Sequence, residues 1–127
     1  MSVNEFISTA FTQKAIYDGL QPLRACRRHV NRSLWMAWSA ASAAKVIETD
    51  LLPALEAFLA TVDRANSVVD DRIAQGEWQS HAFLAVARDR LETYRVARDK
   101  LSVLVKRAAA GEATRRELMA ELRSMPR

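Results

Sequence analysis

The chain has 127 residues, of which 50% are hydrophobic, 27% charged and 7% aromatic, and its formal net charge is +4. This length and balance fit one globular domain with a single core, and they exclude a disordered or fibrous chain. One cysteine excludes an internal disulfide and a multi-cysteine zinc site, and with only two histidines we expect neither a metal site nor another cofactor.

The distribution of charged residues along the sequence predicts a cytoplasmic protein that does not enter a membrane. Residues 1–20 include Glu5, Lys14 and Asp18, so they lack the uncharged core of a secretory signal peptide. The longest weakly polar run, residues 33–44, is shorter than the ~20 residues that a membrane-spanning helix needs.

Helical signals begin at the first residues and are interrupted at Gly19 and Pro22. The segment from Ser2 to Glu5 has the form of an N-terminal capping box and precedes apolar residues at helical spacing. We predict that Gly19 and Pro22 end this helix, because Gly favours the left-handed closing position and Pro interrupts the hydrogen-bond ladder. A second helix is then predicted over residues 22–48, which contain no further breaker.

The third predicted helix, residues 50–75, has a sustained apolar pattern. Asp50 is placed as its cap, and Pro53 is tolerated in its first turn. Its apolar residues recur in steps of four and three, the heptad spacing of a helix that packs along its whole length. This seam consists of Leu51, Leu55, Phe58, Val62, Ala65, Val69 and Ile73.

A fourth helix is predicted to begin within residues 77–80 and to end at Ala110. A second capping box, from Thr114 to Glu117, then opens a short fifth helix. Short connections between long helices imply antiparallel neighbours. The expected fold is therefore all-α: a single domain over residues 1–127, built as an antiparallel up-down bundle of four helices plus a short C-terminal helix.

Charge is shared unevenly among these helices. Residues 22–48 carry five basic residues and one acid, whereas residues 50–75 carry five acids and two basic residues. On the fourth helix, basic and acidic residues are spaced to compensate one another along one solvated face. These residues are Arg88, Glu92, Arg95 and Asp99.

One face of the second helix combines several guanidinium groups with an aromatic ring. A guanidinium donates two parallel hydrogen bonds to a phosphate and keeps its charge, and a tryptophan can stack on an unpaired base. We therefore expect a non-catalytic subunit of a larger assembly that binds the phosphate backbone of single-stranded RNA or DNA without reading its sequence. In architecture and charge it resembles the small helical subunits of RNA-guided interference complexes. The candidate nucleic-acid-binding residues are Arg24, Arg27, Arg28, Arg32 and Trp35.

A second interpretation stays open at this point. The arginine-rich face can instead pack against the acidic third helix, which would neutralise it inside the bundle. The protein would then be a protein–protein interaction module, such as an adaptor, chaperone, immunity protein or assembly subunit. The apolar seam of the third helix could serve a partner helix or self-association, and arginine beside tryptophan is typical of interface hot spots.

A remote alternative comes from Arg24 and His29, which are separated by four residues. This spacing resembles that of HEPN-type ribonucleases, which are also all-helical. The resemblance implies metal-independent RNA cleavage in a dimer cleft, with Arg24 and His29 as site residues. Cys26 lies between arginines that would lower the pKa of an exposed thiol, but we interpret it as a small interior or interface residue.

Overall fold

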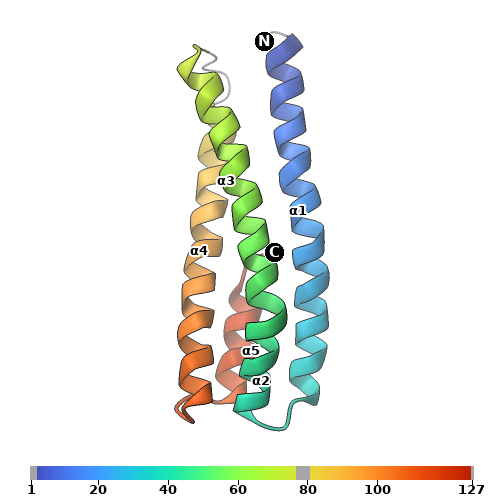
Figure 1. Ribbon diagram of the computed structural model, residues 1–127, viewed down its shortest axis with the longest axis vertical. Helices are drawn as coiled ribbons and strands as arrows, with labels where there is room; N and C mark the ends of the chain where they lie inside the picture. The colour runs from blue at the N-terminus through green and yellow to red at the C-terminus, as the bar shows by residue number, and fades with distance from the viewer. Residues whose placement is uncertain (1–2, 77–80, 127) are drawn as a thin grey trace.

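The computed structural model describes residues 3–76 and 81–126, with side chains over 13–76 and 85–126. The described backbone is helical and contains no strand, which confirms the predicted all-α bundle (Figure 1). Its elements are α1 (Val3–Met36), α2 (Ala40–Val46), the π-helical turn η1 (Ile47–Leu51), α3 (Leu52–Ala74), α4 (His81–Ala109) and α5 (Arg115–Ser124).

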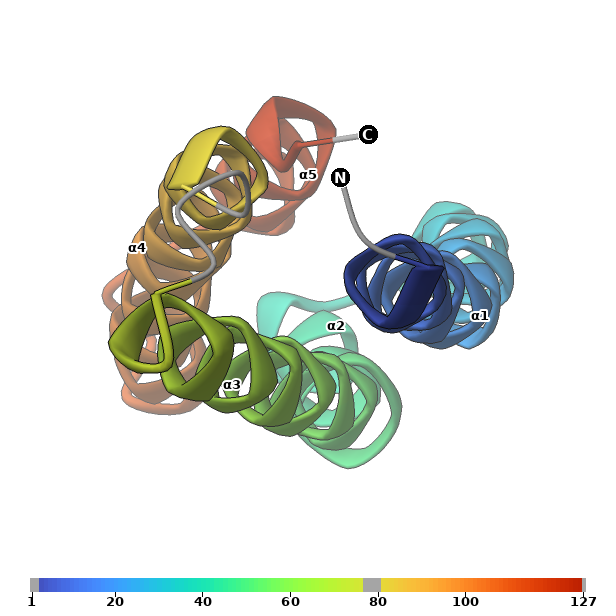
Figure 2. The same cartoon turned by 90° about the horizontal axis from the view of Figure 1, so that it is seen from above.

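The helices form a long antiparallel bundle, and α5 spans only part of its length (Figure 1). Figure 2 shows α1, α3 and α4 at three corners, with α2 continuing into α3 and α5 near the fourth corner. In Figure 1, α5 lies beside only the lower half of α4. Within the described ranges, no helix combines the length and apolar character that spanning a membrane requires.

The predicted helix end at Gly19 and Pro22 is wrong, because α1 continues through both residues. Gly19 lies where α1 meets α3: a Cβ atom there would be 3.2 Å from Thr61 Cγ2. Its missing side chain therefore permits a close approach of two helices. Pro22 is exposed, and the carbonyl to which it cannot donate belongs to Asp18, which is also exposed and open to water.

The chain turns instead within residues 37–39, which were predicted to lie inside the second helix. Ser39 has an extended backbone, with φ −136° and ψ 159°, and its hydroxyl accepts a hydrogen bond from Ser42 N at 3.1 Å. This is the geometry of an N-cap residue, so Ser39 begins a new helix, α2.

Asp50 does not cap a helix, contrary to the prediction, since α2, η1 and α3 follow one another without a break. Asp50 lies inside the π-helical turn, where Leu52 N donates to Ile47 O. That turn ends two residues before Pro53, which lies at the start of α3. A π-helical turn shifts the bonding pattern by one residue, which accommodates a proline that has no N–H to donate.

The predicted apolar seam of α3 forms the centre of the core. All of its residues from Leu51 to Val69 are buried, and Ile73 is partly buried. Phe58 meets Tyr94 of α4 edge-on, with ring centroids 4.8 Å apart. At the start of α5 the predicted Thr114 cap is confirmed, because its hydroxyl accepts from Glu117 N at 3.2 Å. The capping box predicted from Ser2 to Glu5 lies outside the described residues and side chains.

The close approach at Gly19 generates a stability prediction. We expect Gly19→Val to lower the free energy of unfolding by about 1–3 kcal/mol, because the new side chain overpacks against Thr61. Adding Thr61→Ser, which removes Cγ2, should recover part of the loss. Chemical denaturation measures both effects, with Gln21→Val at an exposed site of the same helix as the control. Equal stability of Gly19→Val and Gln21→Val would contradict the packing described.

Candidate nucleic-acid interface

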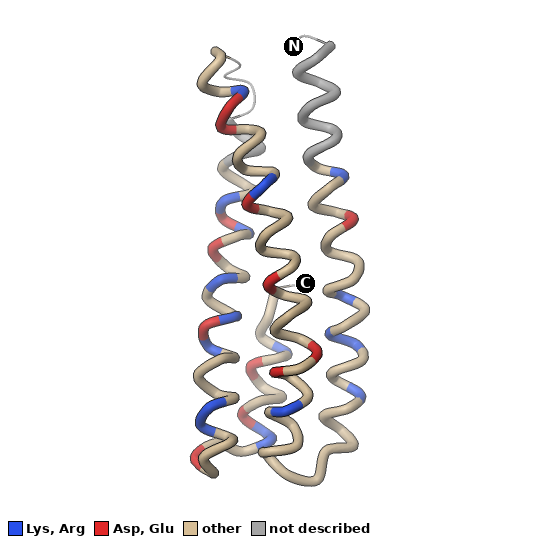
Figure 3. Tube along the Cα trace, in the orientation of Figure 1, with Lys and Arg blue, Asp and Glu red and all other residues tan. Residues whose placement is uncertain are grey.

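Three of the four acidic residues of α3 form ion pairs with arginines of α4, and among the described side chains none of the three pairs with an arginine of α1. The arginines expected to be compensated along α4 itself instead reach across to α3, and Arg98 also contacts Asp99 on its own helix. Figure 3 shows acidic and basic positions side by side on these two helices. The interhelical pairs are Arg88–Asp70, Arg95–Asp63 and Arg98–Glu56, with N–O distances of 2.7, 2.8 and 3.2 Å.

The arginine-rich face of α1 points outward. Arg24, Arg28 and Arg32 are exposed, as is Trp35. In the part of the chain that the structure describes, no ion pair joins any of these three guanidinium groups to a carboxylate. The interpretation in which this face is neutralised by the acidic third helix therefore does not match the observed ion pairs.

Arg27 has a different environment from the other arginines of α1, because it holds the C-terminal end of the chain. Its guanidinium is partly buried and donates to Pro126 O at 2.6 Å and to Met125 O at 3.4 Å. The hydroxyl of Tyr94 donates to the same Pro126 oxygen at 3.2 Å. Residues from α1 and α4 thus anchor the segment that follows α5 between them.

The surroundings of Tyr94 are strongly cationic. Desolvation raises the pKa of its hydroxyl, while the positive charges of Arg27, Arg24 and Arg90 oppose that rise. Three guanidinium groups from two helices therefore act on one point at the junction of α1, α4 and the C-terminal segment.

A surface depression of about 460 Å³ lies between α1 and α5 beside this junction. We call it the arginine cleft. It brings together three of the predicted residues, Arg24, Arg27 and Arg28, with Arg123 from α5. None of its lining residues is acidic. They are Arg24, Arg27, Arg28, Asn31, Leu122 and Arg123.

Arg123 was not among the predicted site residues, because its position next to α1 depends on how α5 docks. A signal was present in the sequence: Arg123 directly follows Leu122, whose four-residue spacing from Leu118 places these two apolar residues on one face of the short helix. A residue beside an inward position lies at the edge of a helix–helix contact. Both leucines are buried, which places Arg123 at the border with α1.

The C-terminal end of α1 and the turn that follows it expose large apolar side chains. Trp35 is 68% exposed, Met36 86% and Trp38 92%. Trp35 and Trp38 line a second depression together with Arg115, Arg116 and Arg123, so Arg123 is shared with the arginine cleft. We call the group Trp35, Met36 and Trp38 the aromatic tip. Cations and aromatic rings therefore follow one another along the boundary of α1 and α5.

Arg32 lies apart from the cleft. It lines a shallow depression on another flank of α1, together with His29, Met36 and Trp38. Of the five predicted residues, the structure thus groups three in the arginine cleft and places Trp35 beside it. Arg32 contributes positive charge on the neighbouring flank.

Arg24 and His29, the pair that resembles a ribonuclease site, face different neighbours. Arg24 borders the arginine cleft, whereas His29 Nε2 lies 3.5 Å from Asp50 Oδ2. The two side chains do not converge within one chain. Among the described residues, no cluster of three or more His, Cys, Asp or Glu is placed to hold a metal ion.

Comparisons of the chain with protein-family models, with curated proteins and with solved structures find no match.

Cys26 provides a test of the interface between α1 and η1. Its thiol donates to Asp50 O at 3.1 Å, and burial, followed by the charge of Asp50, raises the pKa of the thiol. Since the thiolate is the reactive form, we expect native protein at pH 8 to react with iodoacetamide at least ~10-fold more slowly than urea-unfolded protein. Mass spectrometry measures the alkylated fraction over time. Equal rates would show that the thiol is open to solvent and that α1 does not pack on η1 as described.

Proposed function

We propose that this protein binds the phosphate backbone of single-stranded nucleic acid without reading its sequence, as a non-catalytic subunit of a larger assembly. The observation that supports this proposal best is the arginine cleft, in which four guanidinium groups gather and none of the lining residues is acidic. Three of them, Arg24, Arg28 and Arg123, are exposed and pair with no carboxylate among the described residues, and such a concentration of positive charge favours the binding of an anion. A phosphate-bearing strand supplies that anion.

The cations of the cleft suit phosphate groups in particular. The planar fork of arginine donates two parallel hydrogen bonds to phosphate oxygens, and its charge persists at every physiological pH. Arg24, Arg28 and Arg123 present this fork from two helices, while Arg27 is held by the C-terminal carbonyls. Each phosphate that is neutralised releases counterions, so affinity falls as salt increases. Contacts to phosphates fix position but carry no direct sequence information.

The aromatic tip favours a single strand over a duplex. In a duplex the base faces are covered by their stacked neighbours, whereas an unpaired base can stack on an aromatic side chain. Trp35 and Trp38 are exposed next to Arg115 and Arg116, so the rings and cations can engage bases and backbone of the same strand.

The aromatic tip also supports a second candidate function, a protein-interaction module. Three large apolar side chains within four residues form an exposed patch of the kind that marks protein interfaces. The two functions differ in their response to salt. A protein complex that is insensitive to salt and does not bind a short single strand in sedimentation experiments would favour the interaction module.

The arginine cleft yields a binding prediction. We expect Arg24→Ala/Arg28→Ala to lower the affinity for a labelled oligouridylate at least ~10-fold, and equally for other sequences, because phosphate contacts are lost. The slope of log K against log salt should become shallower by about 1.4 if each arginine neutralises one phosphate of a single strand. Fluorescence anisotropy at several salt concentrations measures both quantities.

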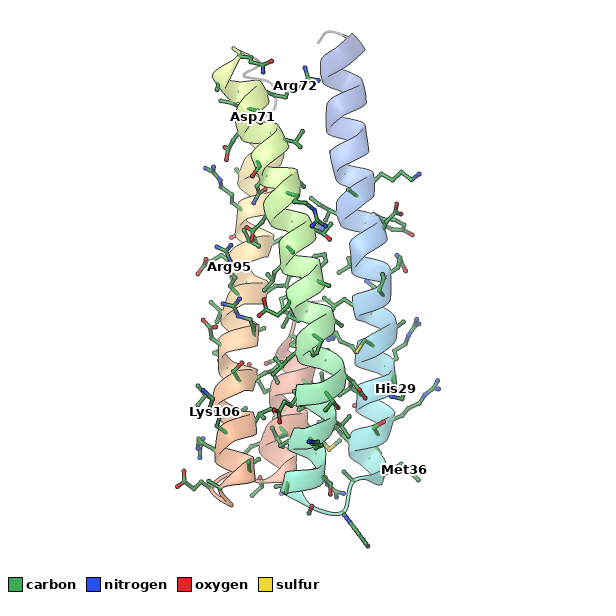
Figure 4. The ribbon with its side chains drawn as sticks, viewed as in Figure 1. His29, Met36, Asp71, Arg72, Arg95 and Lys106 are labelled. Atoms are coloured by element: carbon green, nitrogen blue, oxygen red, sulfur yellow. The ribbon has the colours of Figure 1, made fainter. Side chains whose placement is uncertain are left out.

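The matched control removes the same charge from the far side of the bundle. Lys100 and Lys106 are exposed on α4 and do not line the cleft, and Figure 4 shows Lys106 on the side away from α1. Lys100→Ala/Lys106→Ala should leave the affinity within about twofold of the wild type, because long-range screening reduces distant charge effects. The proposal fails if the two double variants behave alike.

The aromatic tip yields a prediction about strand type. We expect Trp35→Ala to weaken single-strand binding by about 1–3 kcal/mol, because a stacked base loses its platform. Binding to a duplex of equal length should change little. The comparison uses the same anisotropy assay. Equal losses for both nucleic acids, or no loss for the single strand, would contradict base stacking at this site.

A further inference from the structure

The fourth corner of the bundle is filled over only part of its length. α5 occupies that corner over Arg115–Ser124, while α1 and α4 extend well beyond it (Figure 1). Within the described residues, α1 and α4 each pack on α3 but have almost no direct contact with each other. Above α5 they border an open groove of about 620 Å³, which we call the α1–α4 groove. Its lining residues are Gln13, Ile16, Tyr17, Leu20, Arg24, Val86, Ala87 and Arg90.

The α1–α4 groove has an apolar floor and a cationic border. Ile16, Leu20 and Ala87 are buried at its base, whereas Tyr17 is 59% and Val86 54% exposed. When a partner covers apolar side chains that are this exposed, the free energy of the complex is lowered. The groove also includes Arg24 and Arg90, and none of its lining residues is acidic.

We propose that the α1–α4 groove binds an acidic amphipathic helix of a partner protein. A helix fits because the groove continues the bundle corner that α5 occupies lower down. Along α1 it extends from Gln13 to Arg24, which is ~16 Å or about three helical turns. Apolar residues at i, i+3 or i+4, and i+7 would cover Tyr17 and Val86. Acidic residues beside them would pair with Arg24 and Arg90.

Charge favours such a partner over a second copy of this chain. A second copy would have to present a helix with both an apolar face and unpaired acids. Three of the four acids on α3 already pair with arginines of α4, so that helix has little negative charge left for a second copy. The exposed part of α1 would bring further arginines toward Arg24 and Arg90.

The proposal goes beyond nucleic-acid binding and rests on different residues, Tyr17 and Val86. Arg24 alone borders both the arginine cleft and the α1–α4 groove. An acidic helix in the groove would therefore compete with a phosphate for Arg24. This shared residue would couple partner binding to the release of nucleic acid.

The test uses two synthetic helical peptides of about 18 residues, with Leu at i, i+4, i+7 and i+11. One peptide carries Glu beside the leucines, and the other carries Lys at the same positions. We expect the Glu peptide to bind the full-length protein at micromolar concentration in an anisotropy assay. The Lys peptide should bind at least ~10-fold more weakly, because it meets Arg24 and Arg90 with like charge.

Variants locate the binding site without altering its charge. Tyr17→Ser/Val86→Ser should weaken the Glu peptide at least ~10-fold by removing apolar contacts. Val103→Ser is the control, because Val103 is equally exposed on α4 but outside the groove. Oligonucleotide affinity should be unchanged in both variants, which separates this test from that of the proposed function.

Three results would overturn the proposal. They are equal binding of the Glu and Lys peptides, Glu-peptide binding that survives Tyr17→Ser/Val86→Ser, and no peptide binding at all. Sedimentation adds a fourth: a dimer of the wild type that Tyr17→Ser/Val86→Ser dissociates would assign the groove to a second copy of the chain.

Discussion

The pairing of acidic side chains on α3 with arginines on α4 is the constraint on which the rest of the structure depends. Because Asp63 and Asp70 face α4, the net positive charge of the chain is not spread evenly over its surface. On α1 and α5, exposed guanidinium groups have no carboxylate partner in the described part of the chain. Individual exposed ion pairs add little stability, so their main consequence here is the distribution of charge.

The second determinant is the docking of α5. Buried Leu118 and Leu122 hold it against the bundle, and Arg27 and Tyr94 fix the residues that follow it. This docking creates the arginine cleft, because it brings Arg123 beside α1. The shortness of α5 creates the α1–α4 groove, since the bundle corner above it has no helix. One small element thus defines both candidate binding surfaces.

Features that depend on neighbours along the chain could be predicted from the sequence. Features that depend on contacts between distant segments could not. The heptad seam of α3 and the Thr114 cap are local patterns, and both are confirmed. Gly19 was taken as a helix end, but its role is set by Thr61, more than forty residues away. The α3 acids pair with α4 because of how these two helices are aligned, and Arg123 lies beside α1 because of how α5 docks. Neither composition nor periodicity predicts these arrangements.

Among the residues that the structure describes, the guanidinium groups of Arg24 and Arg28 have no carboxylate partner, and the charge of the arginine cleft depends on this. The most direct measurement is the unfolding free energy of Arg24→Gln/Arg28→Gln at low and high salt. Without internal partners, neutralising these residues relieves mutual repulsion, so stability should be unchanged or higher at low salt, and any gain should shrink as salt is added. A loss of about 1 kcal/mol or more at low salt would show that these arginines are paired inside the molecule, and it would contradict the account.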